Sequence, residues 1–284
     1  MLRGGLWERA LAALARHTAV LGPADWLAPE TACDWPLAHL PDDHLGPELD
    51  GLGLDHAVHR QGETRRKRVL IADMDSTIVQ SETLDELAGE AGIKDQIAAI
   101  TMRSMRGELD FAEALTERVG ALKGLEEAAL ARTLARTRVM PGATRLVRTM
   151  RAQGAICWLV SGGFSYFTSH IAKQVGFHAD RSNRLCIADG RLTGTVGQPI
   201  LDRNAKLEAL HALCGEAGVA PAEALAVGDG ANDLAMIQAA GMGVAFQAKP
   251  AVKEAARFRV NRADLTTLLY FQGYRAAEIT DRLP

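Results

Sequence analysis

The chain has 284 residues, of which 48% are hydrophobic, and its formal net charge is −3. A chain of this length can bury a sizeable core, so we expect one large domain or two modest ones, and its nearly balanced charge provides no basic surface for nucleic acid or an anionic membrane. The four cysteines are widely spaced and form no CxxC pair, which argues against a disulfide scaffold or a zinc site.

The first residues predict a helix rather than an export signal. Leu6, Ala10 and Leu14 have helical spacing, with Trp7 and Leu11 beside them. Charged residues interrupt this stretch, so it lacks the continuous apolar segment of a signal peptide, and no part of the chain approaches the ~20 apolar residues that span a membrane. We therefore expect a cytoplasmic protein without a membrane-spanning segment.

Residues 1–64 differ in composition from the rest of the chain. They contain three of the four tryptophans and lead into the polar stretch "RQGETRRKR". This stretch predicts a linker whose run from Arg65 to Arg68 is exposed to water, so we divide the chain into an N-terminal segment, residues 1–64, and a core, residues 65–284. The sequence leaves open whether the N-terminal segment binds a regulator, docks against a second copy in a homodimer, or covers the core sheet.

Strands and helices alternate from Val69 onward. Four short apolar runs, "RVLIAD", "AICWLV", "EALAVGD" and "GVAF", predict buried strands, and helical patterns stand between them. Apolar strands separated by helices are typical of a parallel sheet that is covered on both faces. The pattern therefore predicts an α/β fold with a doubly wound, Rossmann-like parallel sheet.

A long helical insertion, residues 83–139, separates the first two predicted strands. Apolar residues from Leu84 to Ala91 have helical spacing, and Gly92 is suited to end that helix. An insertion directly after the first strand lies over the carboxyl end of the sheet, where open α/β sheets bind ligands, so we expect a helical cap over a site. Farther along, "LCIADGRLTGTV" predicts a hairpin, because Asp-Gly is a common hairpin turn.

Small and acidic residues stand at the ends of three predicted strands: Asp73 and Asp75, then Ser161 and Gly162, then Asp229, Asn232 and Asp233. Since all strands of a parallel sheet end on the same side, these residues converge on one crevice. The carboxylates of Asp73, Asp75 and Asp229 would repel one another there without a cation. Mg²⁺ fits, because it prefers a few carboxylates together with water and phosphate oxygens.

The same crevice has the parts of a phosphate site. Ser161, followed by two glycines, offers a hydroxyl and unobstructed N–H groups, and Lys206 adds a cation. Together with a strand-end aspartate, these parts match phosphoryl transfer to a carboxylate, a known covalent route. Taken singly, Asp73, Asp75 and Ser161 also suit helix caps, and Lys206 suits a solvated surface. Such separate roles do not explain why all these residues occur together in this chain.

Four short motifs, in their order, resemble the haloacid dehalogenase superfamily. They are "DMDST" at the first strand, "VSGG" at the second, and then "NAK" and "VGDGANDL". The stretches "DSTIVQSETLDELA", "RGELDFAEALTERV" and "SNRL" are similar to the phosphoserine phosphatase branch of that superfamily. The resemblance covers residues 69 to about 250. It implies Mg²⁺-dependent hydrolysis of L-phosphoserine to L-serine and phosphate, the last step of serine synthesis.

The resemblance also implies a role for each candidate site residue. It makes Asp73 the nucleophile that forms an aspartyl-phosphate, and Asp75 the acid/base. It assigns Mg²⁺ to the carboxylates of Asp73 and Asp229 and to the backbone carbonyl of Asp75. The remaining roles are phosphoryl binding by Ser161, Gly162 and Lys206, substrate contact by Asn232, and support of the metal or the lysine by Asp233.

Substrate selection would depend on Glu82 and Arg118. The resemblance assigns the substrate ammonium to Glu82 and the substrate carboxylate to Arg118. A guanidinium on the apolar face of a helix is costly unless an anion meets it. From the residues alone, a snorkelling side chain or a structural ion pair is equally open for Arg118, and a charge at a helix start is equally open for Glu82.

Two rival functions stand beside this one. The first is a relative that acts on another small phosphate ester or passes the phosphoryl group to an alcohol such as homoserine, since the shared motifs do not separate these reactions. The second is a signalling domain that accepts a phosphoryl group. The second is disfavoured, because Asp75 beside Asp73 would speed hydrolysis of the acyl phosphate, and because such a domain has no place for the helical insertion.

Overall fold

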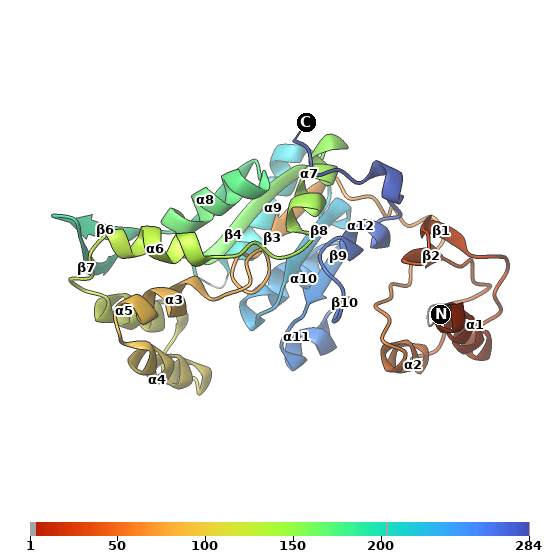
Figure 1. Ribbon diagram of the computed structural model, residues 1–284, viewed down its shortest axis with the longest axis horizontal. Coiled ribbons are helices and arrows are strands. Elements are labelled where there is room, and N and C mark those ends of the chain that lie inside the picture. Colours follow the sequence, from red (N-terminus) through yellow and green to blue (C-terminus); the bar gives the residue numbers. More distant parts are fainter. Residues whose placement is uncertain (1–3, 203, 284) are drawn as a thin grey trace.

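The computed structural model of the protein describes residues 4–202 and 204–283 (Figure 1). A parallel sheet with helices on both faces forms the core. The N-terminal segment lies at one end of the molecule, and the helices inserted after the first core strand lie at the other. Within the described ranges, every helix is too short or too polar to cross a membrane.

The core sheet has six strands in the order β10-β9-β8-β3-β4-β5, and each neighbouring pair is parallel. The strands are β3 (Val69–Ala72), β4 (Ile156–Phe164), β5 (Ala179–Asn183), β8 (Ala224–Gly228), β9 (Met242–Phe246) and β10 (Phe258–Val260). The four predicted strands are β3, β4, β8 and β9, and the doubly wound, Rossmann-like fold is confirmed. The sequence did not predict β5, which carries mainly polar residues, or β10, which has only three residues.

Helices cover both faces of this sheet. One face carries α7 (Ala143–Ala152), α8 (Ser165–Val175) and α12 (Thr267–Phe271), and the other carries α9 (Ala205–Ala217), α10 (Leu234–Ala239) and α11 (Pro250–Ala255). Leu70 and Ala72 of β3 pack on the first face, and Val69 and Ile71 pack on the second. Because side chains alternate between the faces of a strand, a strand covered on both sides needs an apolar residue at every position.

The cap, residues 83–139, contains the helices α3 (Thr83–Glu90), α4 (Lys94–Met105), α5 (Phe111–Ala121) and α6 (Ala128–Arg136). It stands between β3 and β4, which confirms the predicted insertion. Gly92 follows α3 with a left-handed φ of 69°, as a residue that ends a helix often does. The predicted hairpin is present as β6 (Leu185–Ala188) and β7 (Arg191–Val196). Leu192 of this hairpin exchanges backbone hydrogen bonds with Gly124 and Leu125 of the cap.

The N-terminal segment has a small apolar core of its own. It contains α1 (Gly4–His17), β1 (Asp25–Ala28), β2 (Ala32–Asp34) and α2 (Leu45–Gly51). Ala10 and Leu14 of α1 are buried in a cluster with Leu45 and Leu49 of α2. Leu11, which the predicted helical stripe included, is 40% exposed. It lies one residue, about 100°, around the helix from Ala10 and so falls outside the buried face.

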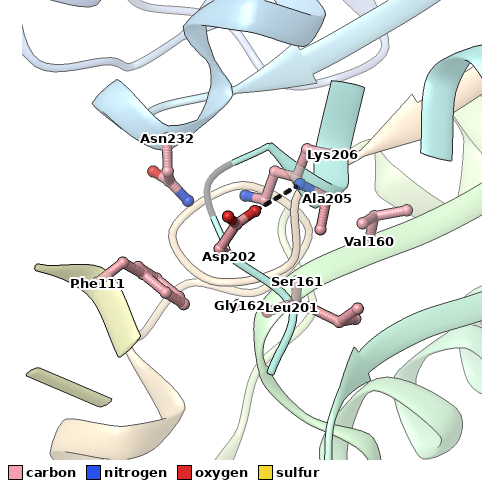
Figure 2. A pocket seen from close by; sticks show the side chains of 9 residues that line it. All are labelled: Phe111, Val160, Ser161, Gly162, Leu201, Asp202, Ala205, Lys206 and Asn232. Atoms are coloured by element: carbon pink, nitrogen blue, oxygen red, sulfur yellow. Dashed lines mark hydrogen bonds between the residues drawn. The ribbon is translucent and has the colours of Figure 1, made fainter. Parts of the chain in front are cut away.

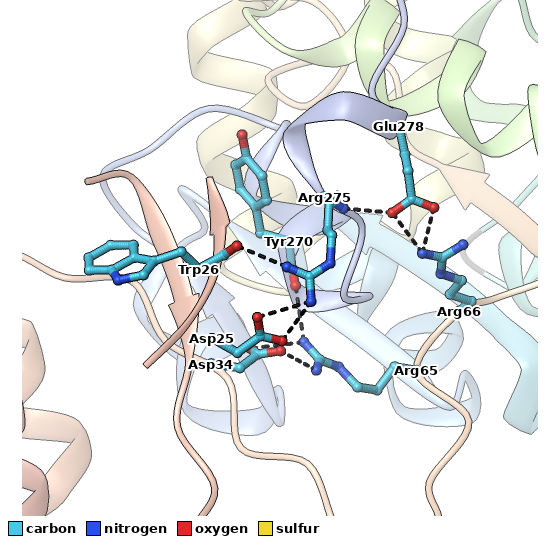
Figure 3. A network of polar contacts seen from close by, with 8 residues as sticks. All are labelled: Asp25, Trp26, Asp34, Arg65, Arg66, Tyr270, Arg275 and Glu278. Carbon is cyan, nitrogen blue, oxygen red and sulfur yellow. Dashed lines mark hydrogen bonds and ion pairs between the residues drawn. The ribbon is translucent and has the colours of Figure 1, made fainter. Parts of the chain in front are cut away.

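The prediction of a solvated linker is wrong for two of its residues. Arg65 joins the N-terminal segment to the core, because its guanidinium donates to Asp34 at 2.6 Å and to the backbone carbonyl of Tyr270 (Figure 3). It also donates to the backbone carbonyl of Phe271. Lys67 is only 4% exposed, and its ammonium donates to two backbone carbonyls. Apart from the carbonyl of Thr64, the groups that accept hydrogen bonds from Arg65 and Lys67 come from distant parts of the chain.

Further contacts hold the N-terminal segment against the core. Arg275 pairs with both carboxylate oxygens of Asp25, at 2.8 and 2.9 Å, and donates to the backbone carbonyl of Trp26 (Figure 3). The carboxylate of Asp55 accepts the backbone N–H groups of residues 261–263, directly after β10. The segment is therefore tied to the chain directly after β10, the edge strand of the sheet.

Gly243→Ala is expected to destabilise the core. A Cβ at Gly243 in β9 would lie 1.8 Å from the backbone oxygen of Ile237 in α10, so the strand and the helix would have to separate. Overpacking of this kind typically costs about 1–3 kcal/mol. The control is Gly215→Ala in α9, whose Cβ would meet nothing within 4 Å and where alanine favours the helix. Thermal unfolding should give a lower Tm for Gly243→Ala only; equal Tm values would contradict this packing.

Candidate active site

The carboxyl ends of three adjacent strands meet at one edge of the sheet. Asp73 follows β3 and Asp229 follows β8, while Ser161 belongs to β4 on the other side of β3. Ser161 was expected beyond the end of its strand, but β4 continues to Phe164, and its register with β5 shifts between Val160 and Phe164. Such irregular pairing disrupts the regular ladder and is frequent next to active sites.

Lys206 lies between two carboxylates. Its Nζ is 2.6 Å from Oδ1 of Asp73 and 2.5 Å from Oδ1 of Asp233, and all three side chains are buried. Burial alone would lower the pKa of Lys206, but Asp233 and Asp73 raise it above its ordinary value, so the ammonium stays charged. The other oxygen of Asp233, Oδ2, accepts the backbone N–H of Gly230 at 2.9 Å, which fixes the orientation of this carboxylate.

The carboxylates at this edge outnumber the ammonium that pairs with them. One oxygen from each of Asp73, Asp229 and Asp233 lies within 4.8 Å of the other two. Burial, followed by repulsion from Asp233, raises the pKa of Asp73 well above its ordinary value and the pKa of Asp229 to about 6. A hard divalent cation binds carboxylate oxygens and would offset both effects. The residues therefore fit a divalent metal ion.

The carboxylate of Asp75 is held from two sides. Its Oδ1 accepts the backbone N–H of Thr83 at 2.8 Å, and its Oδ2 accepts the hydroxyl of Ser161 at 3.3 Å. The Ser161 hydroxyl oxygen accepts the N–H of Gly163 at 2.8 Å. A Cβ at Gly163 would lie 3.1 Å from both the Asp75 and the Ser161 oxygens, so glycine permits this close approach. Burial, followed by the negative charge of Glu82, raises the pKa of Asp75 to about 6.

Glu82 lies at the start of α3, near the strand-end carboxylates. It is exposed, and its Oε1 accepts the hydroxyl of Ser76 at 2.6 Å. Ser76 has a left-handed φ of 55°, which is uncommon for a residue other than glycine and which clusters at functional sites. The charge of Glu82 contributes to the raised pKa of Asp75, after burial. The structure therefore brings Glu82 within electrostatic reach of Asp75, and its role toward a substrate stays a prediction.

The first turn of α5 touches the core directly. A Cβ at Gly162 would lie 3.0 Å from Cζ of Phe111, so the phenyl ring packs on the backbone after Ser161. Arg118 follows seven residues later on the same face of α5, about 10 Å along the helix. It is partly buried, and burial lowers the pKa of its guanidinium, while Asp85 and Glu82 act in the opposite direction.

A small pocket lies where these elements meet, and Figure 2 shows the side chains around it. The lining residues are Phe111, Val160, Ser161, Gly162, Leu201, Asp202, Ala205, Lys206 and Asn232. Phe111 approaches from the cap, and Asn232 and Lys206 approach from the core. Asn232 therefore lines the pocket together with Ser161 and Lys206, and its contact with a substrate stays a prediction.

Two residues near this pocket were not predicted. Asp202 accepts the backbone N–H of Ala205 at 3.2 Å, at the start of α9 (Figure 2), and that of Asn204 at 2.7 Å. Asn183 donates to the backbone carbonyl of Gly162 at 2.9 Å. The signal for Asp202 was its position just before the "NAK" motif, and the signal for Asn183 was the "SNRL" stretch.

A family model described as haloacid dehalogenase-like hydrolase matches residues 67–241. The chain therefore belongs to this family. This result agrees with the strand-end aspartates, the lysine and the inserted cap described above.

Within the family, the chain is similar to phosphoserine phosphatases. It is 43% identical over 236 residues to the phosphoserine phosphatase of Streptomyces coelicolor, an alignment that covers 83% of this chain and 58% of that protein. The chain spans 56% to 65% of the length of four curated relatives that have this name.

Two solved structures show the same likeness. A structure described as a phospho-aspartyl intermediate analogue of phosphoserine phosphatase has a TM-score of 0.68 and 36% identity, and the match covers 72% of this chain and 99% of that chain. The unliganded structure of a probable phosphoserine phosphatase from Vibrio cholerae has a TM-score of 0.80 and 31% identity. That match covers 96% of this chain and 84% of the other, so it includes most of the N-terminal segment.

Proposed function

We propose that the protein hydrolyses L-phosphoserine to L-serine and inorganic phosphate, with Mg²⁺ and through an aspartyl-phosphate at Asp73. The observation that carries this proposal is the contact of 2.6 Å between the buried Asp73 carboxylate and the Lys206 ammonium. Asp75 and Ser161 are hydrogen-bonded to each other beside them. The names of the similar proteins support phosphoserine as the substrate, and the reaction would then complete serine synthesis.

The reaction would proceed in two halves. In the first, a carboxylate oxygen of Asp73 bonds to phosphorus, the bond from phosphorus to the serine oxygen breaks, and Asp75 gives that oxygen a proton. In the second, Asp75 takes a proton from a water molecule that attacks phosphorus, and the bond to Asp73 breaks. Phosphate leaves, and Asp75 is again protonated for the next cycle.

Three groups would bind the phosphoryl oxygens. They are the Lys206 ammonium, the Ser161 hydroxyl and the backbone N–H of Gly162, all of which line the pocket. Preorganised donors of this kind stabilise charge that develops in a transition state, because they need not reorient during the reaction. Asn232, on the same pocket, would contact the substrate as the phosphoryl group transfers.

The carboxylates of Asp73 and Asp229, with the backbone carbonyl of Asp75, would hold Mg²⁺. Asp233 would not bind the ion directly, because one of its oxygens pairs with the Lys206 ammonium and the other accepts the N–H of Gly230. When bound, Mg²⁺ neutralises negative charge on the phosphoryl group. The carboxylates of Asp73 and Asp229 contribute by holding the ion, and the positive charge of Lys206 favours the ionised form of Asp73.

Selectivity for an amino acid would come from the cap. Glu82 would bind the substrate ammonium and Arg118 the substrate carboxylate. Phe111 packs on Gly162 at the phosphoryl end of the pocket, and Arg118 lies two turns farther along the same face of α5. This separation suits a small substrate that has its phosphate at one end and a carboxylate at the other.

The test is phosphate release from a panel of phosphorylated small molecules, with Mg²⁺ and after chelation. L-phosphoserine should be hydrolysed fastest, and chelation should remove the activity. Equal rates across the panel would contradict phosphoserine selectivity, and turnover unaffected by chelation would contradict the metal. Adding homoserine distinguishes hydrolysis from transfer, because a transferase would yield phosphohomoserine in place of free phosphate.

Arg118→Ala is expected to lower kcat/KM for L-phosphoserine by roughly 30- to several-thousand-fold. The estimate takes the cost of leaving a buried charge without its partner, about 2–5 kcal/mol. O-phosphoethanolamine, which has the ammonium but no carboxylate, should be affected far less. The ratio of the two kcat/KM values measures the effect, and Arg118→Lys should restore it only in part, because an ammonium lacks the two-pronged geometry of a guanidinium.

The matched control for Arg118 is Arg103→Ala. Arg103 is another cap arginine, but its side chain is 42% exposed and pairs with Glu117 at 2.6 Å near the surface, where ion pairs contribute little. The ratio of kcat/KM for L-phosphoserine to that for O-phosphoethanolamine should be the same in Arg103→Ala as in the wild type. If Arg118→Ala lowers kcat/KM equally for L-phosphoserine and O-phosphoethanolamine, Arg118 is a structural residue of the cap.

A further inference from the structure

The peptide unit between Gly162 and Gly163 is held at both of its polar atoms. The N–H of Gly163 donates to the Ser161 hydroxyl oxygen at 2.8 Å, and the carbonyl of Gly162 accepts from the side-chain amide of Asn183 at 2.9 Å. In a trans peptide the carbonyl and the N–H point in opposite directions. The contact to Asn183 on one side therefore orients the N–H toward Ser161 on the other.

Asn183 has no freedom to make this contact differently. It ends β5 and is 1% exposed. Its amide also donates to the carbonyl of Leu201 at 3.4 Å, and its Oδ1 accepts the N–H of Leu201 at 2.8 Å. An amide has two N–H donors and one carbonyl acceptor, so each donor and the acceptor has a partner here. Loss of the side chain would leave buried backbone groups without partners, which is costly.

Leu201 leads directly into the segment that carries Lys206. Asp202 follows it and accepts the N–H groups of Asn204 and Ala205, where α9 begins. The single amide of Asn183 therefore joins the backbone after Ser161 to the backbone that leads to Lys206. Both segments line the pocket, whereas Asn183 itself does not.

We propose that Asn183 is a positioning residue for phosphate binding: it fixes the Gly162–Gly163 peptide, and through it the Ser161 hydroxyl, relative to the start of α9. The inference rests on the proposed function, in which Ser161 and Lys206 bind the phosphoryl group. Asn183 acts through these groups and does not touch the substrate.

The test compares Asn183→Ala with Thr168→Val in the complete protein with Mg²⁺. Thr168 is also fully buried and bonds to Asp180 and Ser182 of the same strand, at 2.6 and 2.7 Å, so both variants lose buried hydrogen bonds next to β5. Asn183→Ala should raise KM for L-phosphoserine and Ki for inorganic phosphate together by about 10- to 100-fold. Loss of a residue that orients the groups binding a ligand typically has an effect of this size. Thr168→Val should lower Tm but leave both constants near their wild-type values.

The outcomes separate this inference from the proposed function. If the wild type neither hydrolyses phosphoserine nor is inhibited by phosphate, the proposed function fails. Suppose instead that the wild type hydrolyses phosphoserine and is inhibited by phosphate. If the Ki for phosphate then changes no more in Asn183→Ala than in Thr168→Val, Asn183 is only a structural residue. If Asn183→Ala does not fold, Asn183→Asp decides in the same way, because it keeps the acceptor for Leu201 but loses the donor to Gly162. Failure of both variants to fold would assign Asn183 to folding and overturn the proposal.

Discussion

Asp73→Asn is expected to lose L-phosphoserine turnover by more than about 10⁴-fold, the scale of loss when a covalent nucleophile is removed. An amide cannot attack phosphorus as a carboxylate does, and it binds a divalent cation more weakly. The protein should remain folded, because the amide oxygen can still accept the hydrogen bond from Lys206. Phosphate release in the presence of Mg²⁺ measures the loss, and thermal unfolding reports the fold.

The control for Asp73 is Asp180→Asn. Asp180 is a carboxylate of β5 that accepts hydrogen bonds from Thr168 and Ser169, at 2.6 and 3.0 Å, outside the candidate site. This variant should keep turnover near the wild-type rate. Turnover near the wild-type rate in Asp73→Asn as well would rule out Asp73 as the nucleophile.

Asp75→Asn is expected to lower kcat by about 10²–10⁴-fold, the usual contribution of a general acid or base. Asp75 would serve in both halves of the reaction, first as an acid and then as a base. Asparagine preserves an oxygen that can accept the N–H of Thr83, which Asp75 accepts at 2.8 Å, so the start of α3 should stay in place. Steady-state rates with L-phosphoserine check the size of the effect.

Labelled phosphoserine shows which half-reaction depends more on Asp75. After an acid quench, Asp75→Asn should contain protein-bound phosphate if hydrolysis of the aspartyl-phosphate slows more, and none if loss of the serine oxygen slows more. The double variant Asp73→Asn/Asp75→Asn should trap no label, because the acceptor is absent. Normal rates in Asp75→Asn would contradict its role as acid and base.

The periodicity of the chain predicted much of the fold. Runs such as Val69–Ala72 are apolar at every position because helices cover both faces of the sheet, and this requirement is visible in local sequence. Strands β5 and β10 carry no such signal. The first is mainly polar, the second has three residues, and each is paired on one side only, at an edge of the sheet.

The general position of the candidate site was also predictable. The strands of a parallel sheet end on one side, so Asp73 and Asp229 had to lie near each other once β3 and β8 were neighbours. The sequence could not tell which carboxylate Lys206 would contact. It pairs with Asp73 and Asp233, which lie at positions far from it in the chain, and only the packing of α9 on the sheet brings the three together.

The sequence by itself determined the apolar strands, the helical cap and the set of residues that can carry the chemistry, because each depends on nearby residues. The tertiary structure decided the partners of polar groups. Arg65 and Lys67 were expected in water, yet Arg65 donates to the carbonyl of Phe271, 206 positions away, and Asn183 donates to Gly162. A polar side chain becomes buried only where folding brings a partner to it, and no local pattern records which distant group that will be.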